Sequence, residues 1–195
     1  CTDGQIRIFS LKDSSLVGNY TSPFGNVIHQ IESVGPGYLV AANGNTLWQV
    51  TIGTNLASTW TNVGTLFTGD GLIPATDMIV VSTDVWVITD GAGLFHYSGG
   101  SVQPYDRQNV LPSDSVVAFE MAGTYLLIGL ADAGVARRDL STGNWVATWN
   151  TGNWLLSDDV HSMSAVSGWV HILADDVVYS SNTTSLQFHY PWPIF

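Results

Sequence analysis

The feature that most constrains this chain is a short motif that recurs at a nearly constant interval. Residues 90–97 align with residues 131–138 and 174–179, and looser copies begin at Asp3 and Asn43. The spacings between the equivalent small residues are 41, 48, 41 and 42 positions, counted along Gly4, Asn45, Gly93, Gly134 and Asp176. A repeat of this length accommodates four short β-strands, so the chain is predicted to be built from copies of one small sheet.

A second marker precedes three of these motifs and supports the same period. It reads Leu-Pro-Ser-Asp-Ser-Val at residues 111–116 and Leu-Leu-Ser-Asp-Asp-Val at residues 155–160, with a weaker copy at 73–78. The apolar runs between the markers are short, such as residues 85–88 and 126–130, and helical periodicity is nearly absent. These patterns predict an all-β chain of about eighteen short strands.

The repeat resembles the β-propeller repeats found in sensor regions of two-component regulators. That pattern runs Leu-Pro-Ser-Asn-Asp-Val, then a strand, then Trp-x-Gly-Thr-x-x-Gly-Gly-Leu and a final aromatic-Asp pair. Residues 86–94 match it well. Residues 127–139 match less well because Leu127 replaces the tryptophan, and the last unit replaces the glycine pair with Asp175-Asp176. The resemblance implies four-stranded antiparallel blades and a role in sensing.

We predict one β-propeller-type domain over residues 1–195, in the form of an incomplete ring. Its parts are a half blade at 1–21 and four blades near 22–66, 67–107, 108–150 and 151–195. The inner strands should be unbroken apolar runs, because neighbouring blades cover them, and the turn between second and third strands should be left-handed. An open ring exposes unpaired strand edges. Three outcomes stay open: a fragment of a longer protein, association with copies of itself or another chain, or a smaller closed barrel or sandwich.

The composition excludes two classes of partner. Charged residues are 11% of the chain, with 16 acids against 5 Lys or Arg, and the net charge is −11. Such a chain lacks the clustered cations that binding to a nucleic-acid backbone or an anionic membrane requires. No run approaches the about 18 apolar residues of a membrane span. A polar, acidic surface with few charges is common outside the cell, so we expect an extracellular or cell-surface location.

No catalytic or cofactor motif is present, and the chain is predicted not to be an enzyme. There is no GxSxG, P-loop, HExxH or EF-hand loop. The single cysteine, Cys1, excludes an internal disulfide and a Cys-x-x-Cys metal site. His161 and His171 are the nearest approach to a metal pair, and we interpret both as partly buried, hydrogen-bonded histidines. The prediction is therefore of no cofactor, with Ca²⁺ as the one ion that an acidic surface could bind.

The repeat places most of the acidic residues at one end of the sheets. In a propeller, the turns between second and third strands share that end with the loops that lead into each blade. The predicted binding rim consists of seven carboxylates: Asp90, Asp114, Asp132, Asp158, Asp159, Asp175 and Asp176. Such a rim could hold Ca²⁺ through oxygen ligands or attract a cationic partner. The alternative is that each Asp only stabilises its own turn.

The aromatic residues are dense in the last third of the chain and supply a second candidate surface. The predicted contact residues are Trp154, Trp192 and Phe195, because exposed aromatic rings stack on sugars and dominate protein interfaces. The alternative is packing between blades. Pro191 and Pro193 exclude a regular central strand in the tail, which favours docking of Trp192 and Phe195 on a neighbouring surface.

Together these patterns predict a non-catalytic extracellular module for binding or assembly. Its partner would be a protein, another copy of the chain paired through open blade edges, or a carbohydrate. The first alternative is a sensor domain for an oligosaccharide, as the resemblance implies. The second is a fragment of a propeller glycosidase, whose acids would be a pair among Asp90, Asp114, Asp132 and Asp158 with carboxyls about 5 or 6.5–9.5 Å apart.

Overall fold

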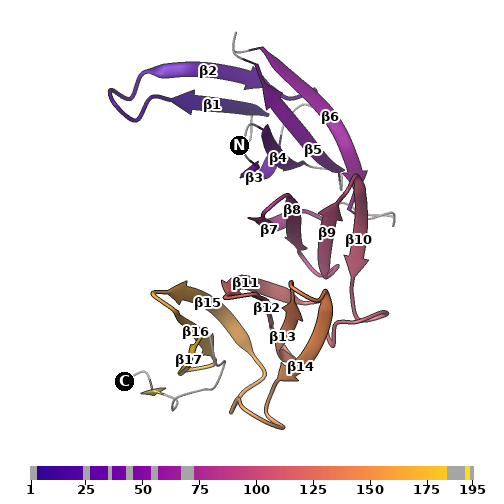
Figure 1. Ribbon diagram of the computed structural model, residues 1–195, viewed down its shortest axis with the longest axis vertical. Coiled ribbons are helices and arrows are strands. Elements are labelled where there is room, and N and C mark those ends of the chain that lie inside the picture. The colour runs from indigo at the N-terminus through magenta and orange to yellow at the C-terminus, as the bar shows by residue number, and fades with distance from the viewer. Residues whose placement is uncertain are drawn as a thin grey trace. The chain divides into compact units, whose positions relative to one another are not determined.

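The computed structural model describes residues 4–23, 27–34, 37–42, 46–53, 57–66, 73–183 and 192–193, with the side chains of all but 37–42 and 192–193. Every regular element in these ranges is a β-strand, and the strands are numbered β1 to β18 (Figure 1). The prediction of an all-β chain is confirmed. The chain forms two compact units, residues 1–90 with 94–104 and residues 91–93 with 105–195.

The first unit contains one two-stranded and two four-stranded sheets. The two-stranded sheet consists of β1 (Gln5–Phe9) and β2 (Leu16–Thr21), which are antiparallel. The next sheet consists of β3 (Ile28–Val34), β4 (Gly37–Ala42), β5 (Thr46–Ile52) and β6 (Ser58–Thr65). The third consists of β7 (Ala75–Val81), β8 (Asp84–Thr89), β9 (Leu94–Ser98) and β10 (Ser101–Tyr105). In each sheet, strands consecutive in the chain are hydrogen-bonded neighbours.

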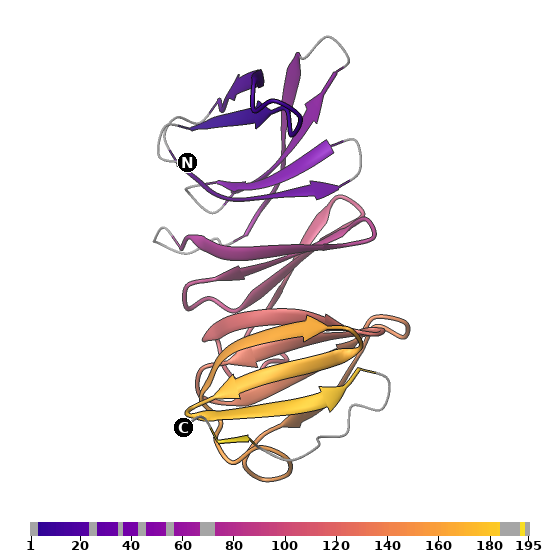
Figure 2. The same cartoon turned by 90° about the vertical axis from the view of Figure 1, so that its left-hand side faces the viewer.

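The second unit contains two four-stranded antiparallel sheets. One consists of β11 (Val116–Ala122), β12 (Tyr125–Leu130), β13 (Gly134–Asp139) and β14 (Asn144–Trp149). The other consists of β15 (Val160–Val166), β16 (Trp169–Ala174), β17 (Val177–Asn182) and the two-residue β18 (Trp192–Pro193). Figure 2 shows β15 to β17 as neighbouring arrows of alternating direction. The sheets are thus four-stranded hairpin arrays, as the repeat predicts.

All four four-stranded sheets share one irregularity near the start of their first strand. The pairing register shifts between Ile28 and Gln30, Ala75 and Asp77, Val116 and Ala118, and Val160 and Ser162. A β-bulge of this kind leaves one extra residue on the first strand and re-aims its side chain. The bulged residues are His29, Thr76, Val117 and His161.

The second strands of two sheets, β8 and β12, are the most buried among the strands whose side chains are described. In β8 and in β12 every residue after the first is buried. These strands carry the continuous apolar runs of the sequence, so the prediction that inner strands are covered on both faces is confirmed there. In the second unit, Leu127 of β12 packs in one core cluster with Val160 and Ile172 of the neighbouring sheet.

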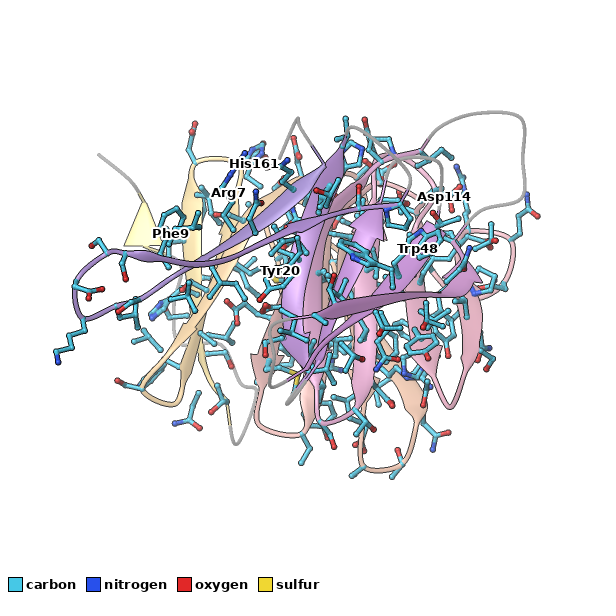
Figure 3. All side chains as sticks on the ribbon, turned by 90° about the horizontal axis from the view of Figure 1, so that it is seen from above. Arg7, Phe9, Tyr20, Trp48, Asp114 and His161 are labelled. Carbon is cyan, nitrogen blue, oxygen red and sulfur yellow. The ribbon has the colours of Figure 1, made fainter. Side chains whose placement is uncertain are left out.

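The two-stranded sheet packs against the sheet that follows it. Ile6 of β1 contacts the buried pair Ile28 and Val50. Tyr20 of β2 is buried, whereas Phe9 is exposed, and Figure 3 shows both on the first hairpin. Residues 5–21, where the half blade is predicted, thus form a pair of strands with an apolar contact to the next sheet.

Glycine is required in two of the turns that join a second strand to a third. Gly93 and Gly134 have φ of 80° and 78°, and a Cβ at either position would collide with a backbone carbonyl oxygen, that of Tyr105 or Trp149. The left-handed turn is thus confirmed at these two positions. The equation of Asp176 with Gly134 is wrong, because the last sheet uses a shorter turn whose left-handed residue is Asp175, with φ of 47°. Asn45 lies outside the described residues.

Candidate binding rim

Two loops of the second unit that lead into four-stranded sheets share one backbone structure. The first lead-in loop, residues 106–115, precedes β11, and the second, residues 150–159, precedes β15. The carbonyl oxygen of Asp106 accepts hydrogen bonds of 2.9–3.2 Å from the amides of residues 109–111. That of Asn150 accepts hydrogen bonds of 3.0–3.1 Å from the amides of residues 153–155. Both loops therefore begin with the same tight turn.

The Ser-Asp pair of the second sequence marker holds each loop together. Asp114 Oδ1 accepts a hydrogen bond from the Arg107 amide at 2.6 Å. Asp158 Oδ1 accepts one from the Thr151 amide at 2.6 Å, and Asp158 Oδ2 accepts another from Thr151 Oγ1 at 3.0 Å. Amide donors to a carboxylate form strong, charge-assisted hydrogen bonds. These two predicted rim acids thus stabilise their own loops, which is the ordinary role of Asp in a turn.

Backbone hydrogen bonds tie the turns between second and third strands to the lead-in loops. The Gly134 amide donates to the carbonyl oxygen of Asp158 at 2.8 Å, and the Ala131 amide to that of Ser115 at 3.0 Å. The Asp175 amide donates to the carbonyl oxygen of Asp159 at 3.0 Å. Turns and loops therefore meet at one end of the second unit. We call this end the rim; it comprises residues 106–115, 131–133, 150–159 and 175–176.

The rim carries many acids and a single base. Its acids are Asp106, Asp114, Asp132, Asp158, Asp159, Asp175 and Asp176, and Arg107 is the only basic residue in these segments. Asp132, Asp175 and Asp176 are exposed, whereas Asp114, Asp158 and Asp159 are half-buried. The structure thus brings six of the seven predicted carboxylates to one rim. The seventh, Asp90, lies in the first unit, where it is exposed and its amide donates to the Pro74 carbonyl oxygen at 3.2 Å.

The second lead-in loop presents two exposed apolar side chains. Trp154 is 54% exposed and Leu156 is 72% exposed, while Leu155 between them is buried. The Leu156 amide donates a hydrogen bond of 2.8 Å to Oη of Tyr179, which is itself buried. The predicted contact residue Trp154 therefore stands, exposed, on a loop that its neighbours hold in place.

Asp159, His161 and Asp175 form a mixed cluster of side chains beside that loop. Nδ1 of His161 lies 3.9 Å from Oδ1 of Asp159, and the two side chains are 50% and 48% exposed. One donor atom from each of the three residues lies within 4.8 Å of the others. Figure 3 shows His161 near one end of its strand. The interpretation of His161 as partly buried is therefore wrong, because His161 is the bulged residue between Val160 and Ser162 and its side chain is half-exposed.

His171 has a different environment. Its Nδ1 is 2.9 Å from Oγ of Ser180, its cross-strand partner on β17, and the pair is partly buried. The interpretation of His171 as a partly buried, hydrogen-bonded histidine is confirmed. The two histidines that the sequence suggested as a pair thus have separate partners.

Comparison with known proteins identifies the fold. No family model and no curated protein matches the chain. The computationally designed Ika8 protein aligns with 98% of the chain at TM-score 0.70 and 14% identity. The Dos1 propeller aligns with all of it at TM-score 0.68 and 12% identity.

The chain has a β-propeller fold. An extracellular domain assigned to the hybrid two-component system BT4673 of B. thetaiotaomicron is also similar, at TM-score 0.63 and 12% identity over 99% of the chain. The propeller resemblance found in the repeats is thereby confirmed at the level of the fold. The chain spans 57% of Ika8, 54% of the Dos1 propeller and 24% of the BT4673 domain.

Two of the propeller's basic residues stack on aromatic rings, an arrangement that the repeat pattern does not predict. Cζ of Arg137 lies 4.5 Å from the ring centroid of Trp149. Cζ of Arg138 lies 5.0 Å from that of Tyr105 and 5.3 Å from that of Trp145. Burial lowers the pKa of Arg137, and cation–π contact stabilises both guanidinium groups. The cross-strand pairing of Arg138 with Trp145 is the signal that could have revealed this cluster.

The aromatic tail of the propeller is described only in part. Trp192 and Pro193 form β18 at the sheet edge, where their backbones pair with Val178 and Val177. This agrees with the expectation that the tail prolines exclude a central strand. The side chain of Trp192 and the whole of Phe195 lie outside the described residues. The part of the chain that the structure describes contains no helix with the length and apolarity that a membrane crossing requires.

Proposed function

We propose that this propeller is a non-catalytic, extracellular binding module that holds a cationic protein partner on the rim of its second unit. The observation that carries the proposal is the exposure of Trp154, with Leu156 beside it, on an internally hydrogen-bonded loop. An aromatic ring on a fixed loop loses little conformational freedom when a partner covers it, which favours its use as an anchor.

The charge of the rim supports a cationic partner. Arg107 is the only base among its segments, and the net charge of the chain is −11. Arg137 and Arg138 lie against the rings of Trp149 and Trp145, so they are engaged within their own blade. A partner that presents Lys or Arg around an apolar side chain would match both the acids and the Trp154 anchor.

The roles of two rim acids support binding rather than catalysis. Asp114 and Asp158 are two of the four residues that a glycosidase pair would draw on, and both accept hydrogen bonds from amides of their own loops. A catalytic carboxylate must be available to the substrate or to a water molecule. These carboxylates are engaged in holding the loops.

A second candidate function is the recognition of an oligosaccharide outside the cell. The likeness to the BT4673 extracellular domain favours it. The exposed face of Trp154 would stack on a sugar ring, and neighbouring carboxylates would accept hydrogen bonds from its hydroxyl groups. This candidate uses the same loop, so one experiment separates the two.

The test is a selection of peptides displayed at random against the 195-residue chain, run beside a glycan array. We expect the enriched peptides to carry a net positive charge and at least one aromatic or aliphatic residue. Their affinity should fall at least about tenfold for Trp154→Ala, because the anchor is lost. Trp169→Ala is the matched control, since Trp169 is also exposed but lies at the other end of its sheet.

Two results would decide against the cationic partner. Glycan binding that is lost in Trp154→Ala would assign the rim to the oligosaccharide instead. Peptides that bind Trp154→Ala as well as the parent chain would remove the rim from the proposal altogether.

A further inference from the structure

We propose that Asp159, His161 and Asp175 form a binding site for a divalent transition-metal ion, with Zn²⁺ as its preferred ion. Asp159 and Asp175 belong to the rim and His161 directly follows it in β15. The site does not depend on the proposed partner, because the exposed Trp154 belongs to a different part of the loop. It also differs in kind from a calcium site, which an acidic rim alone would suggest.

The distances support the site. Nδ1 of His161 and Oδ1 of Asp159 are 3.9 Å apart, and the three donor atoms lie within 4.8 Å of one another. Donor atoms around a tetrahedral zinc ion are about 3.4 Å apart, given bonds of about 2.1 Å. The side chains of His161 and Asp159 are about half-exposed, and Asp175 is exposed. Small rotations about their χ angles are therefore enough to bring the donors to bonding distance.

The backbone already holds the three residues together. Asp159 and His161 flank the buried Val160, which starts β15, and Asp175 starts the turn after β16. The amide of Asp175 donates to the carbonyl oxygen of Asp159 at 3.0 Å. The donors come from two segments joined by a strand pair and a backbone hydrogen bond, so a metal ion would not have to organise a loop.

The donor types select the metal. An imidazole nitrogen with two carboxylate oxygens suits Zn²⁺ and its neighbours in the transition series, whereas Ca²⁺ and Mg²⁺ prefer oxygen ligands alone. Three protein donors leave one position for water, because a tetrahedral ion needs four ligands. The two carboxylates balance the 2+ charge of the ion.

The other four-stranded sheet of the second unit, β11 to β14, has different residues at the equivalent positions. The positions equivalent to Asp159, His161 and Asp175 are Ser115, Val117 and Ala131, since both blades have the bulge in β11 or β15. The same backbone hydrogen bond forms there between the Ala131 amide and the Ser115 carbonyl oxygen, also at 3.0 Å. Turn formation thus explains neither Asp159 nor His161, whereas the φ of 47° at Asp175 by itself favours Asp in that shorter turn.

The first experiment is calorimetric titration of the 195-residue chain with ZnCl₂, CaCl₂ and MgCl₂ in separate runs. We expect one zinc ion per chain and at least tenfold weaker binding of calcium and magnesium. His161→Gln and Asp175→Asn should each weaken zinc binding at least about tenfold, because each removes one of three protein ligands. His29→Gln is the matched control, as His29 occupies the same bulge position in the sheet of β3 to β6.

The second experiment transplants the site. The variant Ser115→Asp, Val117→His, Ala131→Asp should bind two zinc ions per chain, with its thermal unfolding curve checked to show that it is folded. Zinc binding that survives both His161→Gln and Asp175→Asn would overturn the proposal. An absence of zinc binding by the parent chain at millimolar concentration would overturn it as well, and so would a folded triple variant that still binds one ion.

Discussion

The two lead-in loops of the second unit have the same frame and different surfaces. In each loop the carbonyl oxygen of the first residue, Asp106 or Asn150, accepts hydrogen bonds from three amides. The amide of the second residue donates to a carboxylate near the end of the loop, Asp114 or Asp158. The side chains that face solvent differ. Val110 of the first loop corresponds to Trp154 of the second, and the second loop continues into a rim cluster that the first lacks.

This comparison divides the rim acids into two groups. Asp114 and Asp158 recur because the loop needs them, so their presence says little about a ligand. Asp159 stands where the sheet of β11 to β14 has Ser115, with the same backbone hydrogen bond to the facing turn. Asp175 stands where that sheet has Ala131, but in a shorter turn whose left-handed φ of 47° itself favours Asp. A residue that changes while the frame stays constant is therefore the better candidate for function, and a residue that the frame uses is the better candidate for stability.

The largest expected effect comes from the glycines that anchor both frames. Gly134→Ala should destabilise the chain by about 2–4 kcal/mol, because φ is 78° and the new Cβ would collide with the Trp149 carbonyl oxygen. Gly93→Ala should cost about the same for the same reason. Urea unfolding followed by tryptophan fluorescence measures both.

Gly143→Ala separates the collision from the backbone strain. Gly143 has a φ of 73° but its Cβ would meet only the end of the Arg138 side chain, at 3.9 Å. We expect a loss of about 1 kcal/mol. Equal losses at Gly134 and Gly143 would show that the collision adds nothing to the backbone strain. Very different losses at Gly93 and Gly134 would show that the two frames are not equivalent.

Most of the frame could be predicted from the sequence, because it depends on local patterns. The apolar runs of β8 and β12, and Gly93 and Gly134, follow from period and backbone conformation alone. The alignment of Asp176 with Gly134 is wrong because the turn after β16 is shorter than the turn after β12. The repeat spacing varies along the chain, so it does not reveal the length of a single turn. The proximity of His161 to Asp175 depends on strand register and a bulge, which link residues far apart in sequence.

The candidate site was predictable to a smaller extent. The repeat placed six Asp residues on the rim, yet it could not tell which carboxylates the loops use. That distinction requires the hydrogen-bond partners of Asp114 and Asp158, which are amides seven residues away. The bracing of Leu156 by Tyr179 joins residues 23 positions apart and leaves no local signal.

The second prediction tests the division of the acids. Asp158→Ala should destabilise the chain by about 2–3 kcal/mol, since it removes hydrogen bonds from the amide and the hydroxyl of Thr151. Asp114→Ala should lower the free energy of unfolding by about 1–2 kcal/mol, because it removes the hydrogen bond from the Arg107 amide. The exposed Asp132 and Asp176 are the controls, with changes within about 0.5 kcal/mol. If Asp176→Ala destabilised the chain as much as Asp158→Ala, the rim acids could not be divided into those that hold the loops and those that do not.

The third prediction concerns a hydrogen bond that holds the second lead-in loop in addition to the bonds that both loops share. The Leu156 amide donates it to Tyr179. Tyr179→Phe removes the oxygen that accepts the Leu156 amide and should cost about 1 kcal/mol. Hydrogen exchange should quicken at the Leu156 amide by more than at the amides of residues 109–111 in the first loop. Unchanged exchange at Leu156 would show that the frame alone holds the loop that presents Trp154.

The smallest expected effect concerns Asp139, which ends β13 at the turn into β14, at the end of the sheet away from the rim. Its carboxylate holds that turn as Asp114 and Asp158 hold the lead-in loops. Its Oδ1 accepts hydrogen bonds from the hydroxyl of Ser141 at 2.6 Å and from the Ser141 amide at 2.9 Å. These bonds lower the pKa of Asp139 below the ordinary value of 3.8. A lowered pKa in the folded state stabilises the fold above the ordinary pKa, and the contribution is lost as the pH falls through the lowered one.

Ser141→Ala should therefore raise the pKa of Asp139 toward its ordinary value, as measured by an NMR titration of the carboxyl carbon. Ser15→Ala should do the same for Asp13, whose pKa is lowered by the equivalent hydrogen bonds from Ser15 in the β1–β2 hairpin. The two hairpins belong to different units, so a parallel result would show that a turn holds its carboxylate by local bonds wherever it occurs. If neither pKa moves, hydrogen bonding is a poor guide to which carboxylates are engaged. The assignment of Asp114 and Asp158 to the frame would then rest on the unfolding measurements alone.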